Sequence, residues 1–240
     1  MTSALSVRAS RRGARKFLEP SAIIEAISIE ESIVLPGYQA LLASPGTIKV
    51  SEGLVGDVEA AVLRHQAVVA RLRLMLAEAV DAERISSPHD EALAALGLVG
   101  PDSADTPVVT SVARSVCALD AAVADADDAA RMLIAVAFLL VATHALTDPT
   151  NCGTASPALN LMPPPLHRDR ALMERVMAEA VSTLDTPARA ALAGYITTAS
   201  AAFADAGGVK QLYVLRFNPH SLRTSCRSAG LGEVEVLGSR

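Results

Sequence analysis

The stretch Asp105–Leu146, DTPVVTSVARSVCALDAAVADADDAARMLIAVAFLLVATHAL, decides the fold class of this 240-residue chain. It consists largely of Ala, Val, Leu and Ile, and no residue after Pro107 breaks a helix. Its one acidic cluster is Asp125-Ala126-Asp127-Asp128. We therefore predict an apolar helix or helix pair that begins at Thr106-Pro107 and bends at the acidic cluster.

A second long helix is expected from Ser51 to about Ala82. Two series of residues recur there at heptad spacing, which is typical of a buried helical seam. The first series is Val55, Val62, Val69 and Leu76, and the second is Val58, His65, Leu72 and Ala79. A third series widens the seam and so favours burial in a bundle over a bare two-stranded coil. It consists of Leu54, Ala61, Val68 and Met75, and the opposite face carries Asp57, Arg64, Arg71 and Glu78.

Shorter helices are expected on both sides of these two. An amphipathic helix is predicted over residues 20–35, and Pro36-Gly37 should end it. The Pro-, Asn- and Gly-rich segment 148–165 is too long for a plain connector. Further short helices or turns are expected over residues 38–43, from Pro88 to Gly97, over residues 166–184 and from Pro187 to Gly207.

Near the C-terminus the hydrophobic pattern changes from a helical period to alternation. Val209–Phe217 is predicted as a strand, Asn218-Pro219 begins a helix to Ala229, and Glu233–Val236 is predicted as a second strand. The expected fold class is therefore mainly α, a multi-helix bundle with a small C-terminal β-α-β element. Its expected parts are a basic N-terminal arm (1–16), the helical bundle (17–208) and an appendage docked on the bundle (209–240).

The composition favours a folded chain with a tightly packed core. Hydrophobic residues make up 51% of the chain, aromatic residues only 3%, and Trp is absent. Small aliphatic side chains must therefore fill the core, which lets helices approach closely. The formal net charge of −5 gives no general attraction to phosphate backbones, so nucleic acid is not an expected partner.

The expected location is the cytoplasm. The odd number of cysteines (Cys117, Cys152 and Cys226) and the absence of a CxxC pair favour a reduced compartment. Residues 1–16 are basic and contain no acid, which indicates a plain arm or, alternatively, part of a targeting segment for an organelle matrix. The apolar run Met132–Leu146 is shorter than the roughly twenty residues of a membrane span, so it predicts a buried core helix.

The acidic cluster provides the candidate catalytic residues Asp125, Asp127 and Asp128. Asp125-x-Asp127-Asp128 resembles in form the DxDD motif of class II terpene cyclases, in which a protonated carboxyl group protonates an alkene. The resemblance covers only this motif, and the chain lacks the aromatic residues that stabilise carbocations. The structural alternative is a helix start, where Asp127 and Asp128 complement the helix dipole.

His144 and Asp148 form a candidate metal-binding pair, because their spacing allows both side chains to reach one ion. One pair does not make a site, so no metal or cofactor is expected. The alternative for His144, and for His65 in the predicted seam, is a buried histidine that is hydrogen-bonded within the core.

No catalytic motif dominates the chain, so the expected function is that of a non-catalytic assembly, scaffold or accessory subunit. Its expected partners are other proteins or further copies of itself, through the heptad stripe, the basic arm and the C-terminal element. The alternative is an enzyme or a bundle that binds an apolar small molecule. In that case Asp125, Asp127 and Asp128 would be the acid groups and segment 148–165 a lid.

Overall fold

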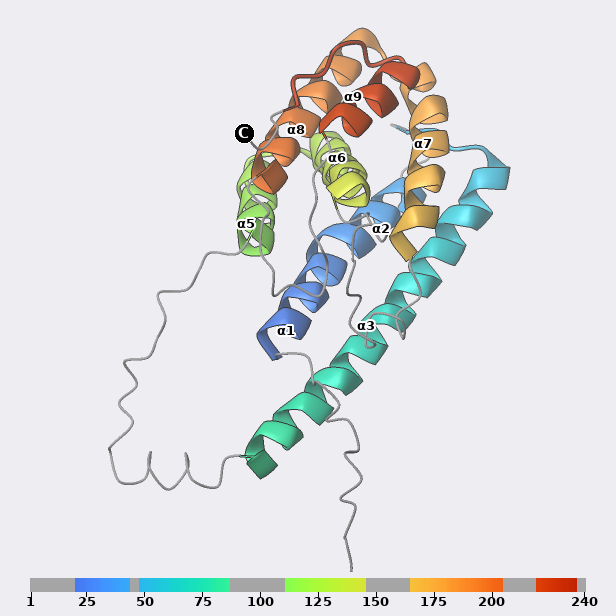
Figure 1. Cartoon of the computed structure of the whole chain (residues 1–240). Coiled ribbons are helices and arrows are strands. Elements are labelled where there is room, and N and C mark those ends of the chain that lie inside the picture. The colour runs from blue at the N-terminus through green and yellow to red at the C-terminus, as the bar shows by residue number, and fades with distance from the viewer. Residues whose placement is uncertain (1–19, 44–47, 87–110, 146–164, 205–218, 237–240) are drawn as a thin grey trace, which may run out of the picture.

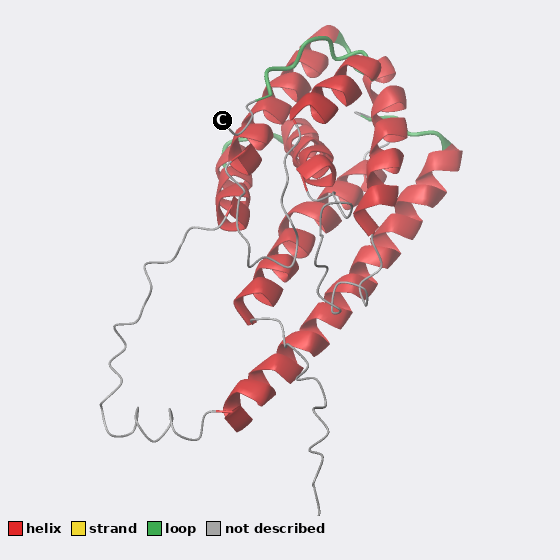
Figure 2. Cartoon of the chain, in the orientation of Figure 1, coloured by secondary structure: helices red, strands yellow, loops and turns green. Residues whose placement is uncertain are grey.

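A computed structural model describes residues 20–43, 48–86, 111–145, 165–204 and 219–236. Within these ranges the chain is a bundle of helices, and none of the described residues forms a strand (Figure 2). The predicted mainly α bundle is therefore confirmed. The helices are α1 (Pro20–Ile29), the π-helix η1 (Glu30–Val34), α2 (Leu35–Ala43), α3 (Glu52–Ser86), α5 (Ser111–Val123), α6 (Asp128–Ala145), α7 (Pro165–Thr183), α8 (Thr186–Ala204) and α9 (Pro219–Ser228).

The apolar stretch that decides the fold forms the helix pair α5 and α6, joined at the acidic cluster. Helix α6 lies in the middle of the bundle and contacts α2, α5, α7 and α8 (Figure 1). Every residue from Met132 to Ala145 except Ala135 is buried. The predicted pair and its bend are confirmed within residues 111–145.

Helix α6 is long and apolar enough to cross a membrane. Among the described helices it alone meets this criterion of length and composition. About two thirds of it, 67%, is buried inside the bundle. The core helix of a soluble protein has the same properties, so this finding is weak evidence for a membrane location.

Helix α3 confirms the predicted seam in part. The second series, Val58, His65, Leu72 and Ala79, is buried. In the first series only Val69 is buried, whereas Val55, Val62 and Leu76 are half-buried. The helix contacts α1, α2 and α7, and in Figure 1 its C-terminal end extends beyond the other described helices. One face of this 35-residue helix, about 50 Å long, is thus fixed to the bundle.

The prediction that Pro36-Gly37 ends the first helix is wrong. The backbone continues through η1 into α2, and the Leu35 N–H donates to the Glu30 carbonyl in the wide register of a π turn. An ordinary α-helix would press the ring of Pro36 against a carbonyl of the preceding turn, and the wider turn relieves this clash.

Gly37 is needed for packing, since it lets α2 approach α6. A Cβ atom there would lie 2.6 Å from Leu139 Cβ and 3.1 Å from the Ala135 carbonyl oxygen. Gly37→Ala should therefore lower the free energy of unfolding by about 1–3 kcal/mol through overpacking. Urea denaturation measures the change, and the matched variant Gly53→Ala, at an exposed helical glycine with open space, should show no such loss.

The predicted C-terminal β-α-β element is not supported. The helix is present as α9, with Leu222 and Cys226 buried, but residues 233–236 form no strand. Their alternation instead buries Val234 and Val236, and Arg223 donates a 2.6 Å hydrogen bond to the Val236 carbonyl. A strand needs a neighbouring strand to pair its backbone N–H and C=O groups by hydrogen bonds, and the described ranges contain no such strand. The other predicted strand, 209–217, lies outside them.

Candidate functional sites

The candidate aspartates lie on the surface at the turn between α5 and α6. Asp125, Asp127 and Asp128 are all exposed. Asp127 Oδ1 accepts a 2.8 Å hydrogen bond from the Ala130 N–H, so it caps α6, and Asp128 stands in the first turn of that helix. This geometry is that of a helix start, in which carboxylates complement exposed N–H groups and the helix dipole.

The candidate metal pair cannot be compared with the structure, because Asp148 lies outside the described residues. His144 itself is buried near the end of α6. Among the described residues no group of three or more His, Cys, Asp or Glu side chains is arranged to hold a metal ion. Residues 1–16 and the segment 148–164 also lie outside the described ranges.

A buried charge cluster joins η1, α3 and α7, and we call it the His65 cluster (Glu30, Arg64, His65 and Asp169). The two ring nitrogens of His65 each lie 2.6 Å from a carboxylate oxygen, Nδ1 from Glu30 and Nε2 from Asp169. Arg64 donates to the other oxygen of Asp169 at 2.8 Å. Glu30, His65 and Asp169 are fully buried, so the cluster balances two carboxylates with two cations inside the bundle.

The two carboxylates keep His65 protonated. Burial alone would lower the pKa of His65, but the hydrogen bonds that the ring donates to Asp169 and Glu30 outweigh it and raise the pKa to about 9. The ring of Tyr38 stacks on His65 with centroids 5.6 Å apart, and burial together with the charge of Asp169 raises the pKa of Tyr38. Because the carboxylates contact opposite ring nitrogens, the three groups do not converge on one metal ion. The cluster fixes α3 to the rest of the bundle.

The raised pKa of His65 predicts a loss of stability at alkaline pH. The unfolded imidazole titrates near 6.5 and the folded one near 9, so this stabilisation is complete below the lower value and disappears as the pH rises through the upper one. The thermal midpoint should therefore fall between about pH 7 and pH 10. The variant His65→Gln should have a lower midpoint and lose most of this pH dependence, which calorimetry would measure.

The face of α3 opposite the core carries a second apolar seam, which we call the outer stripe. It contains Leu63 and Leu74, whose exposed fractions of 67% and 68% are the largest among the exposed large hydrophobic residues. The spacing along the stripe is that of a heptad. Its members, all exposed, are Gly56, Ala60, Leu63, Ala67, Ala70, Leu74 and Ala77.

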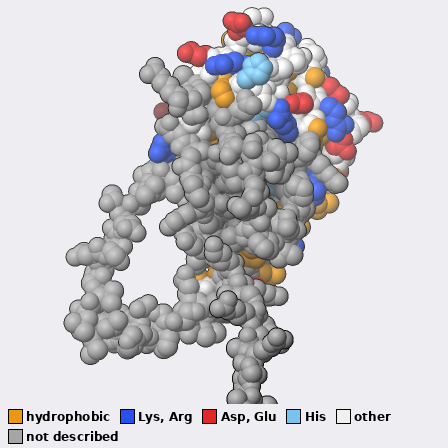
Figure 3. All heavy atoms as spheres, viewed as in Figure 1, with side chains coloured by type: hydrophobic (Ala, Val, Ile, Leu, Met, Phe, Trp, Pro, Cys, Tyr) orange, Lys and Arg blue, Asp and Glu red, His pale blue; other side chains and the backbone are white. Residues whose placement is uncertain are grey.

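Most of the residues that border the outer stripe on its two sides are charged. One border is Glu59, Gln66, Arg73 and Val80, and the other is Asp57, Arg64, Arg71 and Glu78. In the coloured part of Figure 3, acidic, basic and hydrophobic side chains are interspersed. An apolar heptad seam between charged borders is the arrangement by which one helix recognises another.

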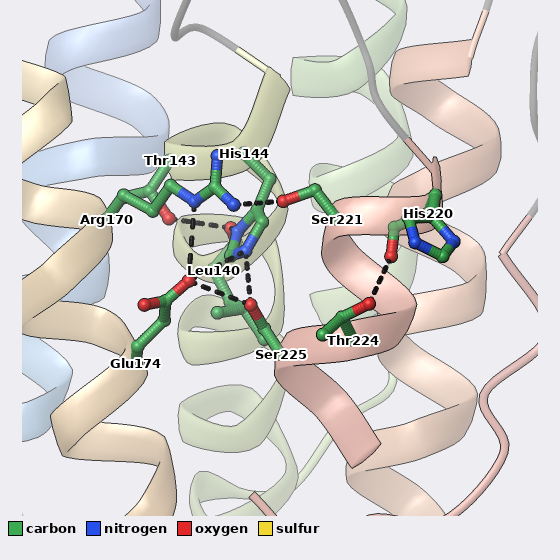
Figure 4. Close-up of polar contacts among 9 residues, drawn as sticks. All are labelled: Leu140, Thr143, His144, Arg170, Glu174, His220, Ser221, Thr224 and Ser225. Atoms are coloured by element: carbon green, nitrogen blue, oxygen red, sulfur yellow. Dashed lines mark hydrogen bonds and ion pairs between the residues drawn. The ribbon is translucent and has the colours of Figure 1, made fainter. Parts of the chain in front are cut away.

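A second polar cluster lies between α6, α7 and α9, and Figure 4 shows its side chains pointing toward one another. His144 Nδ1 donates to the Leu140 carbonyl at 2.9 Å, and Nε2 lies 2.9 Å from Ser225 Oγ. Ser225 Oγ is also 3.0 Å from Glu174 Oε1. Arg170 contacts Glu174 at 3.4 Å and donates to Ser221. Burial, aided by the positive charge of Arg170, lowers the pKa of His144.

Sequence reasoning identified His65 and His144 but not their partners. Glu30, Asp169 and Ser225 come from helices far away in the sequence, and no spacing rule connects them. Comparison with known proteins adds no further information, because no family model, curated protein or solved structure matches this chain significantly.

Proposed function

We propose that this protein is an assembly subunit that associates with a second copy of itself through the outer stripe of α3. The observation that supports this function is the exposed apolar heptad seam, with Leu63 and Leu74 at two of its positions. Alanine and glycine at the other positions let a second helix approach closely, and each leucine then packs against the partner helix.

The charged borders favour a second copy in parallel orientation. In a parallel pair, each residue of the border that contains Glu59 faces a residue of the border that contains Asp57 on the partner helix. The facing residue is the one that lies five positions later in the sequence. This arrangement places Glu59 opposite Arg64 and Arg73 opposite Glu78 of the second copy, and both contacts are attractive. Arg64 keeps its bond to Asp169, and 33% of its side chain remains exposed for the partner.

An antiparallel pair fits less well. Alignment of Leu63 with Leu74 of the partner would place Asp57 near Glu78 and Arg64 near Arg71. Both contacts join like charges, which destabilise such a seam. The charges therefore favour the parallel pair over the antiparallel one.

Light scattering coupled to size exclusion tests the proposal on the full chain. At about 50 µM protein we expect a mass of twice 24.9 kDa, since specific homodimers form well below such concentrations. A mass of 24.9 kDa across the whole accessible concentration range would contradict self-association.

A further inference from the structure

The hydroxyl of Ser225 lies between two proton acceptors. Nδ1 of His144 must carry a hydrogen, because its partner is the Leu140 carbonyl, which can only accept. In the neutral ring Nε2 is then a bare acceptor, and it lies 2.9 Å from Ser225 Oγ. The second neighbour is Glu174 Oε1, to which Ser225 Oγ donates at 3.0 Å. The hydroxyl has a single hydrogen, so it donates either to Glu174 or, after rotation, to His144 Nε2. No donor to this hydroxyl oxygen is found within the described ranges.

Such an oxygen has the features of an activated nucleophile. The diagnostic geometry is a hydroxyl within hydrogen-bond distance of a base that a third group orients. Here the base is His144, and the Leu140 carbonyl fixes its tautomer and ring orientation. Ser221 on the same helix differs, because its hydroxyl receives a hydrogen bond from Arg170.

Solvent can reach this arrangement from one side. His144 is 1% exposed, whereas Ser225 is half-buried and the Glu174 side chain is 44% exposed. The base is thus shielded in the bundle while its hydroxyl partner borders the surface. A general base has to be neutral and oriented while its nucleophile stays accessible, and this arrangement meets both conditions.

We propose that Ser225 is a nucleophilic serine activated by His144 and that it cleaves small carboxylic esters. Ser225 Oγ attacks the ester carbonyl carbon while its proton passes to His144 Nε2. The bond to the alcohol oxygen then breaks, and the alcohol leaves with that proton. Water then attacks the acyl carbon and gives a proton to Nε2. The bond from the acyl carbon to Oγ breaks, Oγ takes that proton back from Nε2, and the acid leaves. This inference is independent of the outer stripe.

A fluorophosphonate probe tests this reactivity on the full chain, with adducts located by peptide mass spectrometry. We expect one adduct, on Ser225 and not on Ser221. The matched control Thr224→Ala changes a neighbouring exposed hydroxyl that donates to the His220 carbonyl, and it should label at the wild-type rate. Ser225→Ala should not label, and His144→Gln should label at least about a hundredfold more slowly. Absence of an adduct on Ser225 in the folded protein would overturn the proposal.

The pH dependence of labelling provides a second test that needs no variant. The pKa of His144 is lowered from its ordinary value of 6.5. The labelling rate should therefore stay constant from neutral pH down to the pKa of His144 and fall only below that pKa. A rate that instead rises continuously into the alkaline range would indicate an unassisted hydroxyl. That result would overturn the role of His144, as would an unchanged rate in a folded His144→Gln variant.

Discussion

Replacement of Asp169 by alanine should lower the free energy of unfolding by about 3–5 kcal/mol, because it leaves buried positive charge without its partner. Asp169 is fully buried and serves both His65 and Arg64. Its loss would leave His65 Nε2 buried without an acceptor and would remove the partner of the partly exposed Arg64 guanidinium. Chemical denaturation followed by circular dichroism measures the effect.

A surface ion pair provides the matched control for this prediction. Glu233 pairs with Arg227 at 3.5 Å, and their side chains are 92% and 70% exposed. Glu233→Ala should leave stability unchanged within error, since exposed pairs contribute little. If Asp169→Ala lowered the free energy of unfolding no more than Glu233→Ala does, the His65 cluster would not be what fixes α3 to the bundle.

The double substitution Leu63→Glu with Leu74→Glu should convert the dimer to a monomer. Both side chains are mostly exposed in the single chain, so the bundle itself should fold as before. In the dimer, each new carboxylate would be buried in the seam beside its counterpart, which should raise the dissociation constant by more than about a hundredfold. Sedimentation equilibrium measures the change.

Ile24→Glu is the control for that variant. Ile24 is also a large exposed hydrophobic residue, at 52%, but it lies on α1 away from the outer stripe. The dissociation constant should therefore not change. An equal loss of association in both variants would mean that general surface hydrophobicity, rather than the outer stripe, holds the copies together.

The fold was largely predictable because its strongest signals are local. The heptad of α3 and the apolar run of α6 indicate helices by periodicity alone, and Asp127 is at a helix start in both sequence and structure. The end predicted at Pro36 failed because a π turn, which no propensity rule predicts, accommodates the proline. The strand predicted at 233–236 failed because alternation reports burial on one side and does not show that a partner strand exists.

The candidate sites were much less predictable, for two physical reasons. Buried polar pairs such as His65 with Asp169 depend on tertiary contacts between helices far apart in the sequence. The outer stripe was missed because an alanine-rich helix has apolar residues on both faces. The heptad spacing places Leu72 in the buried seam, as the structure confirms, but it does not show that Leu74 belongs to a second apolar series that stays exposed.

Cysteine cross-linking across α3 tests the central claim, the parallel pairing of two outer stripes, most directly. With Cys117 and Cys152 replaced by serine, the Leu74→Cys chain should form a disulfide-linked dimer on mild oxidation, because position 74 faces its own counterpart in the parallel pair. An Ile24→Cys chain in the same background should remain monomeric. Linkage of Leu74→Cys only when it is mixed with Leu63→Cys would contradict the parallel arrangement, and no linkage above the Ile24→Cys control would contradict pairing through the outer stripe.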